Sequence, residues 1–292
     1  MRSNEVSSLI SLLDDADSEV ASEVMHTLCA RGEEVLPMLE SAWFGASDKV
    51  LLARIEQVMA QIQDNLTLDR LAEWVKSGAP DTLSGAYYVT KLFRPNAELS
   101  RIRAQVSALS REVWLLLRAH LTAPEQVYVI NHVIYRCFKF SSKRLIDSDR
   151  LLLFSDLLQN KEGCQLSLGL LYCCVAEELS LPITGIGFAQ SAMLGYVDQH
   201  REGAGSREML FFIDPHSGEL CGVQQLAQAI IRYIAPRQSA ERYLAPCTHQ
   251  AYVLRYARIL CDLYQNLNKP DLYAKANRAV KVLSAAGGVK VR

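Results

Sequence analysis

Apolar residues recur every three or four positions along most of the chain, which is the spacing of amphipathic helices. Over the first part they form two similar units, each with two apolar stripes separated by a polar turn. The turns are residues 14–18 and 44–48. A unit length of about 30–40 residues is typical of stacked helical hairpins. Two more short helices are expected at residues 67–77 and 82–93.

The middle of the chain combines helices with strands. The spacing of apolar residues predicts a long amphipathic helix from Leu99 to His120, and a more uniformly apolar helix opens at Gly163. Two strand candidates follow, residues 183–197 and 209–214, and the turn Asp214–Gly218 ends the second one. The change from helical spacing of the apolar residues to short strand-like runs predicts a small antiparallel sheet next to helices.

These patterns divide the chain into three expected parts. Residues 1–95 form a helical array, either HEAT-like or a bundle without repeats. Residues 96–240 hold the strands. Residues 241–292 contain a final helical hairpin, with its helices at 249–268 and 271–285. The predicted fold class is therefore α+β, predominantly α.

Composition and charge narrow the class of protein. The chain has 292 residues, of which 50% are hydrophobic and 22% are charged, as in ordinary soluble proteins. The formal net charge of −1 leaves no broad basic field, so we expect neither a nucleic-acid nor a membrane partner. No apolar run approaches the roughly 18 residues of a membrane span, and the first residues lack the pattern of a signal peptide. We therefore expect a cytoplasmic protein.

The cysteines match neither a disulfide framework nor a metal site. Their spacing contains no CxxC pair, so we expect free cytosolic thiols, no metal and no cofactor. The eight cysteines are Cys29, Cys137, Cys164, Cys173, Cys174, Cys221, Cys247 and Cys261.

Cys164 stands where the apolar helix opens. Unpaired backbone N–H groups and the positive end of a helix dipole stabilise a thiolate at such a position. Papain-like and transglutaminase folds place their nucleophile in this way and present a histidine and a carboxylate or amide from neighbouring strands. Asp214 ends the second strand candidate, so Cys164 and Asp214 are the candidate catalytic residues. Cys164 could also be a redox-sensitive thiol or a plain first-turn residue, and Asp214 could simply cap the turn before Pro215.

Several short segments, in this order, resemble the bacterial SirB-type family of transglutaminase-like proteins. The resemblance covers about residues 85–285. It implies a transglutaminase-like domain over residues 96–240 and a tetratricopeptide-like helical pair over residues 241–292, and it implies a fold more firmly than a reaction. The matching segments are Asn131–Tyr135 with Phe138 and Phe140, Asn160–Gly163 with Leu166–Leu168 and Leu170–Tyr172, Val175–Ala176 with Leu179–Pro182, and Phe212–Pro215 with Gly218.

Two departures from the family pattern affect the chemistry. The family's PGHFLVRY strand corresponds to Ala189–Tyr196, and the position of its histidine is Ser191. Cys164 falls where many members have a non-nucleophilic residue, and Gln165 replaces the proline beside it. The chain thus keeps a thiol and a carboxylate but lacks the base at its expected place.

Three other histidines could supply an imidazole. His216 follows Asp214 in the turn, His200 lies in the polar loop 198–208, and His132 lies in an apolar helix. The simpler interpretation of His216 and His200 is that both are solvated. The simpler interpretation of His132 is that it makes a structural hydrogen bond. A catalytic role stays open for His216 and His200, and a role in lining the site stays open for His132.

We therefore predict a non-catalytic transglutaminase-like protein that acts in protein or peptide interaction. Ser191, His132 and His216 are its candidate binding residues. The alternative is a Cys-nucleophile amide hydrolase or acyltransferase that uses Cys164, which needs an imidazole within hydrogen-bond reach of the sulfur. Redox sensing through Cys164 is a third hypothesis. The oligomeric state stays open.

Overall fold

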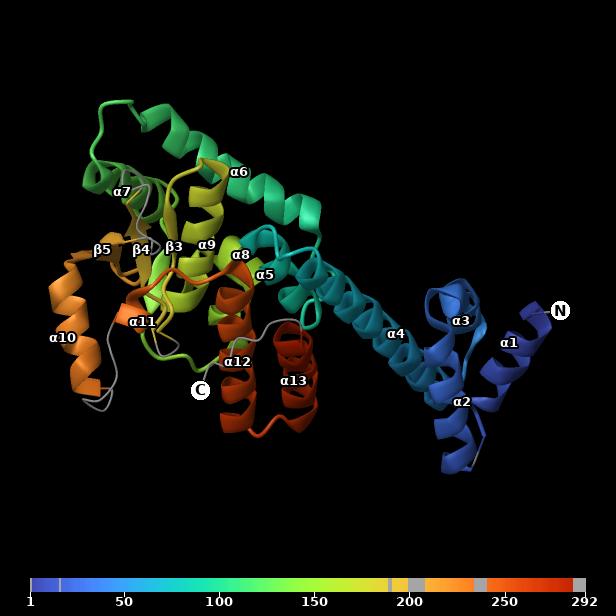
Figure 1. Ribbon diagram of the computed structural model, residues 1–292. Coiled ribbons are helices and arrows are strands. Elements are labelled where there is room, and N and C mark those ends of the chain that lie inside the picture. The colour runs from blue at the N-terminus through green and yellow to red at the C-terminus, as the bar shows by residue number, and fades with distance from the viewer. Residues whose placement is uncertain (1, 16, 189–190, 199–207, 234–240, 286–292) are drawn as a thin grey trace. The chain divides into compact units, whose positions relative to one another are not determined.

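The computed structural model of the chain describes residues 2–15, 17–188, 191–198, 208–233 and 241–285 (Figure 1). The chain divides into two compact units, Met1–Arg70 and Leu71–Arg292. The predicted fold class is confirmed, because helices dominate and the strands form small sheets.

The first unit is made of helices. A carboxylate oxygen of Asp17 accepts the N–H of Glu19 at 2.9 Å and so caps the second helix. The core contains fully buried leucine and isoleucine side chains from every helix or its adjoining turn: Leu13, Leu28, Leu39, Ile55 and Ile62. The elements are α1 (Arg2–Leu12), α2 (Ser18–Arg31), η1 (Gly32–Val35), α3 (Leu36–Gly45) and α4 (Lys49–Lys76), whose last turns belong to the second unit.

The second unit is built around the helix α9 (Gln165–Glu178). Every residue from Leu166 to Ala176 is buried, so this helix is apolar on all sides rather than along one stripe. It contacts α5, α6, α8, α12 and β3, and Figure 1 shows it in the middle of these elements. The other helices before the sheet are α5 (Thr82–Lys91), α6 (Leu99–Leu116), α7 (Ala123–Asn131), η2 (His132–Cys137), η3 (Asp149–Leu151) and α8 (Phe154–Asn160).

The main sheet has the order β3-β4-β5-β6, and all its strands are antiparallel. In the register of β4 and β5, Leu194 lies opposite Ile213 and Gly195 lies opposite Phe212. Both predicted strand regions thus contribute to the sheet. Its strands are β3 (Ile183–Gly185), β4 (Leu194–Val197), β5 (Met209–Ile213) and β6 (Leu220–Cys221), and α10 (Val223–Tyr233) packs against β5.

A second, parallel pair of strands was not expected from the sequence. In it β1 (Ser141–Lys143) pairs with β2 (Glu162–Cys164), and Lys143 lies opposite Cys164. The end of β2 is therefore also the start of α9. The position of Cys164 is fixed from both sides, by a strand and by a helix.

The last helices pack into the second unit. A short α11 (Glu241–Leu244) precedes α12 (His249–Asn266) and α13 (Pro270–Ala285), which form the predicted hairpin. Tyr252, Tyr256 and Tyr264 of α12 are fully buried, and α12 contacts α5 and α9. Within the part of the chain that the structure describes, no helix is both long and apolar enough to span a bilayer.

Candidate functional site

Cys164 is the N-cap residue of α9, as its place in the sequence predicts. Its backbone is extended, with φ of −112° and ψ of 175°. The sulfur accepts the backbone N–H of Ser167, and the Ser167 hydroxyl oxygen accepts the N–H of Cys164 at 3.0 Å. This reciprocal pair satisfies two N–H groups at the helix start, as a capping box does. Cys164 therefore has a structural role that needs no chemistry.

The Ser167 side chain closes the surroundings of the sulfur. Its hydroxyl donates to the carbonyl oxygen of Leu151 at 2.7 Å, and its oxygen lies 3.6 Å from the Cys164 sulfur. Among the described residues, the hydrogen-bond partners of the sulfur are groups of Ser167, and none is an imidazole. Only 2% of Cys164 is exposed. The thiol is thus enclosed, and no residue that the structure describes supplies a base beside it.

Asp214 directly follows β5 and is bound to the residue after Cys164. One carboxylate oxygen accepts the side-chain amide of Gln165 at 2.7 Å and the backbone N–H of His216 at 2.8 Å. The second bond closes an Asx turn, which was one of the two roles considered for Asp214. The first bond brings the start of α9 and the end of β5 together. Asp214 is thus near the thiol region, but its side-chain partner is an amide.

Ser191 lies just before β4 and is turned toward its own backbone. Its hydroxyl oxygen accepts the N–H of Met193 at 3.2 Å. Met193 directly precedes Leu194, which pairs with Ile213 at the end of β5. The Met193 sulfur lies 3.8 Å from the side-chain nitrogen of Gln165. The side chain beside Gln165 is therefore a thioether.

The other candidate histidines lie elsewhere. His216 Nδ1 is 2.7 Å from the Ser142 hydroxyl, and Nε2 accepts the N–H of Arg144 at 3.2 Å. His132 is exposed, and its ring makes no hydrogen bond to another described residue. His200 lies outside the described residues.

The turn after Asp214 is held by α7 and by the π-helical turn η2 that follows it. The Asn131 side chain donates to the Gly218 carbonyl at 2.7 Å, and the Tyr135 hydroxyl donates to the Pro215 carbonyl at 2.7 Å. The hydroxyl of Tyr172 on α9 in turn donates to the Asn131 side chain at 3.2 Å. Burial, with the neighbouring Asp214 charge, raises the pKa of Tyr135, so this hydroxyl stays protonated as a donor.

The segment that carries Ser191 is held by α12. The Arg255 guanidinium donates to the carbonyls of Ser191 and Ile186, both at 2.6 Å. The Tyr252 hydroxyl donates to the Ala192 carbonyl at 3.1 Å, and the guanidinium lies 5.2 Å from the Tyr252 ring centre. Because Arg255 is only 6% exposed, the bonds of Nη1 and Nη2 replace part of its hydration, while Nε is buried without a partner among the described residues. The last hairpin thus shapes the site.

Comparison with known proteins identifies the family. The model of the transglutaminase-like superfamily matches residues 100–258, which is more than half of the chain. The chain belongs to the transglutaminase-like superfamily. No curated protein and no solved structure matches it.

The superfamily match runs from α6 into α12, so it includes every residue of the site described above. Within this transglutaminase-like region, Cys164 and Asp214 stand at the two expected elements, a helix start and a strand end. Within the described ranges no group of three or more His, Cys, Asp or Glu side chains could hold a metal ion.

Sequence reasoning assigned no role in the site to four residues that build it: Gln165, Asn131, Tyr135 and Arg255. Arg255 did carry a signal, because it is a charge on the same helical face as the apolar positions Tyr252 and Tyr256. Such a residue is buried only with partners. Gln165 was noted as a departure from the family pattern, but its bond to Asp214 depends on contacts distant in sequence.

Proposed function

We propose that this transglutaminase-like protein does not catalyse acyl transfer and acts instead by binding a protein or peptide. The observation that carries the proposal is the partner of the Cys164 sulfur, which is Ser167 rather than an imidazole. General acid–base help contributes typically ~10²–10⁴-fold to such reactions, and a thiol without it must ionise alone.

The remaining polar groups of the site support the same proposal. In a working triad the carboxylate orients the base. Here Asp214 is bound by Gln165 and by its own turn, and the Met193 sulfur lies 3.8 Å from the side-chain nitrogen of Gln165. An amide and a thioether cannot take a proton from a thiol near neutral pH. The matching segments Asn160–Gly163 and Phe212–Pro215 support placing the chain in the SirB-type branch, and the replacements at Ser191 and Gln165 make it a degenerate member.

The experiment is a turnover assay with a matched thiol control. The full chain is incubated with a glutamine-containing protein and a labelled primary amine, and separately with a peptide amide. We expect the same low signal from the wild type, from Cys164→Ala and from Cys137→Ala, whose thiol is exposed. Turnover that disappears in Cys164→Ala alone would overturn the proposal.

A Cys-nucleophile hydrolase or acyltransferase is the second candidate, and one observation favours it. The sulfur accepts a backbone N–H at the start of α9, a placement that stabilises a thiolate. His216 would then have to leave Ser142 and Arg144 and turn toward Cys164. This candidate predicts Cys164-dependent turnover that His216→Ala abolishes and Arg144→Ala increases, because the ring is released.

A further inference from the structure

The end of α6 exposes a run of apolar side chains. Its buried face consists of Ile102, Val106, Leu109, Ser110 and Val113. The next residues leave this stripe: Trp114 is 65% exposed, Leu115 is 51% exposed and Leu116 is 44% exposed. A helix face that only meets water carries polar residues, whereas consecutive exposed apolar residues mark binding surfaces.

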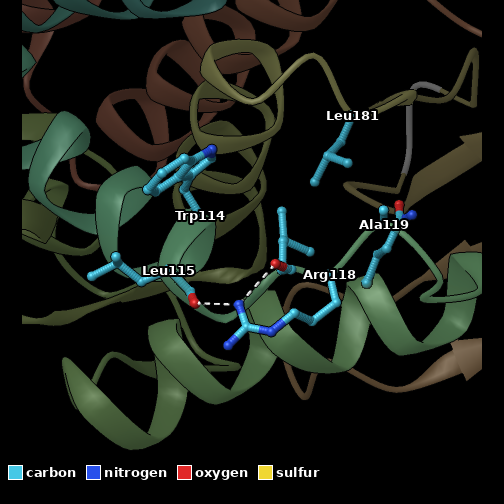
Figure 2. Close-up of a pocket in the computed structure, with 7 residues that line it drawn as sticks. Trp114, Leu115, Arg118, Ala119 and Leu181 are labelled. Carbon is cyan, nitrogen blue, oxygen red and sulfur yellow. Dashed lines mark hydrogen bonds between the residues drawn. The ribbon is translucent and has the colours of Figure 1, made fainter.

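Two of these side chains, Trp114 and Leu115, line a pocket of about 440 Å³. Figure 2 shows it between the end of α6, the start of α7 and Leu181, which follows α9. We call it the α6 pocket. Its lining residues are Trp114, Leu115, Leu117, Arg118, Ala119, Gln126 and Leu181. The pocket is apolar on most sides and carries a single formal charge.

That charge is the Arg118 guanidinium, and one edge of it is already used. Nη1 donates to the carbonyl oxygens of Leu115 at 2.9 Å and Leu117 at 3.3 Å, as the dashed lines in Figure 2 mark. These bonds cap the end of α6 and fix the guanidinium plane. Nε and Nη2 make no hydrogen bond to another described residue. This second edge offers two parallel N–H groups, the arrangement that binds a carboxylate in a bidentate way.

The remaining polar side chain of the pocket, Gln126, is held in place by two hydrogen bonds within the protein. The Gln126 amide nitrogen donates to the Leu121 carbonyl at 3.2 Å, and its oxygen accepts the Tyr196 hydroxyl at 2.6 Å. A ligand therefore meets apolar surface and one preoriented pair of donors. Such a surface complements an apolar side chain with a carboxylate next to it.

We infer that the α6 pocket binds an acidic-apolar peptide segment of a partner protein. An apolar side chain packs between Trp114, Leu117 and Leu181, and an adjacent carboxylate accepts both free N–H groups of Arg118. Tryptophan and arginine are the residue types that dominate binding energy at interfaces. This inference rests on the proposed function and gives it a surface and a class of partner.

A displayed library of random peptides, selected on the immobilised full chain, tests the inference. We expect the selected peptides to share an apolar residue next to Asp, Glu or the terminal carboxylate. Anisotropy of one labelled peptide should then show affinity losses of roughly tenfold or more for Trp114→Ala, for Arg118→Lys and for a peptide with Asn in place of Asp. Arg111→Ala on the exposed face of α6 and Phe44→Ala in the first unit are the matched controls and should bind normally.

The outcomes separate the inference from the proposed function. The inference about the α6 pocket is overturned if the selection enriches no acidic-apolar sequence. It is also overturned if the selected peptides bind Trp114→Ala and Arg118→Lys as tightly as they bind the wild type. The wild type could instead self-associate or bind phosphatidylserine vesicles, and Trp114→Ala could abolish that binding. Either result assigns the surface to another occupant and also overturns the inference. A peptide that binds in the pocket and is then cleaved in a Cys164-dependent way supports the pocket and overturns the non-catalytic proposal.

Discussion

Gln165 and Asp214, 49 positions apart in the sequence, are joined by a 2.7 Å hydrogen bond from the side-chain amide to the carboxylate. This contact links the start of α9 to the end of β5 beside the Cys164 thiol. It gives Asp214 a neutral partner where a triad would have an imidazole. Because Gln165 and Asp214 are both half-buried, the bond also contributes to stability.

Replacing Gln165 by leucine should therefore destabilise the protein. The substitution leaves the Asp214 carboxylate without its side-chain donor, and we expect a loss of about 1–2 kcal/mol in the free energy of unfolding. Urea denaturation followed by circular dichroism measures it. The control Gln224→Leu, on the exposed face of α10, should stay within about 0.5 kcal/mol of the wild type. Equal effects of the two variants would show that the bond does not matter.

Arg255 should be the most sensitive charged residue of α12. Arg255→Met leaves the carbonyls of Ser191 and Ile186 buried without donors, and we expect a loss of about 2–4 kcal/mol. Arg255→Lys should recover only part of this, because an ammonium cannot reproduce the planar fork. Arg258→Ala, one turn further along the same helix, is the control. Thermal denaturation measures the effect. Equal midpoints for Arg255→Met and Arg258→Ala would contradict this role of Arg255.

Gly218 should tolerate no side chain. Its φ of +76° lies in the left-handed region, and an added Cβ would lie 2.7 Å from the Asn131 side chain. We expect Gly218→Ala to cost about 1–3 kcal/mol. The control is Gly222→Ala, where the nearest atom to an added Cβ is 3.8 Å away. If the two variants unfold at the same urea concentration, the turn after Asp214 is not fixed as described.

Glu177 predicts a dependence of stability on pH. Burial raises the pKa of Glu177, while hydrogen bonds from the Thr82 N–H and hydroxyl and the nearby His249 act in the opposite direction. The folded state therefore binds a proton more readily than the unfolded chain, whose Glu pKa is about 4.3. Between that value and the raised folded pKa, the free energy of unfolding contributed by Glu177 falls as the pH rises.

The measurement for Glu177 compares the wild type with Glu177→Gln over a range of pH. We expect the wild type to gain stability relative to the variant as the pH falls from 7 toward about 4.5. Urea midpoints at each pH give the difference. A difference that grows in the opposite direction would mean that the ion pair with His249, rather than burial, governs this carboxylate.

Some of this architecture could be read from the sequence because local patterns determine it. The stripe from Leu99 predicts α6, although the helix ends at Leu116 and not at His120 as expected. The strand candidates become β3, β4 and β5, and Cys164 opens α9 as expected. The apolar stripe that follows the turn 44–48 and the short helix expected at residues 67–77 belong to one helix, α4, because neither glycine nor proline interrupts residues 49–76.

The rest depends on contacts between distant segments. The pair of β1 and β2 has only three residues in each strand and lies in polar sequence, so it has no detectable period. The bonds of Gln165 to Asp214 and of Arg255 to Ser191 exist only once helices and sheet have packed. The roles of Cys164 and Asp214 were therefore foreseeable in position but not in their partners.

The reactivity of the Cys164 thiol tests the central claim most directly. The native chain is treated with iodoacetamide at pH 7.5, and mass spectrometry of its peptides gives the alkylation rate of each cysteine. With an enclosed sulfur and no imidazole beside it, we expect Cys164 to react more slowly than the exposed Cys137. A Cys164 that reacts fastest of all, and loses this reactivity in His216→Ala, would contradict the account and indicate a working thiol–imidazole pair.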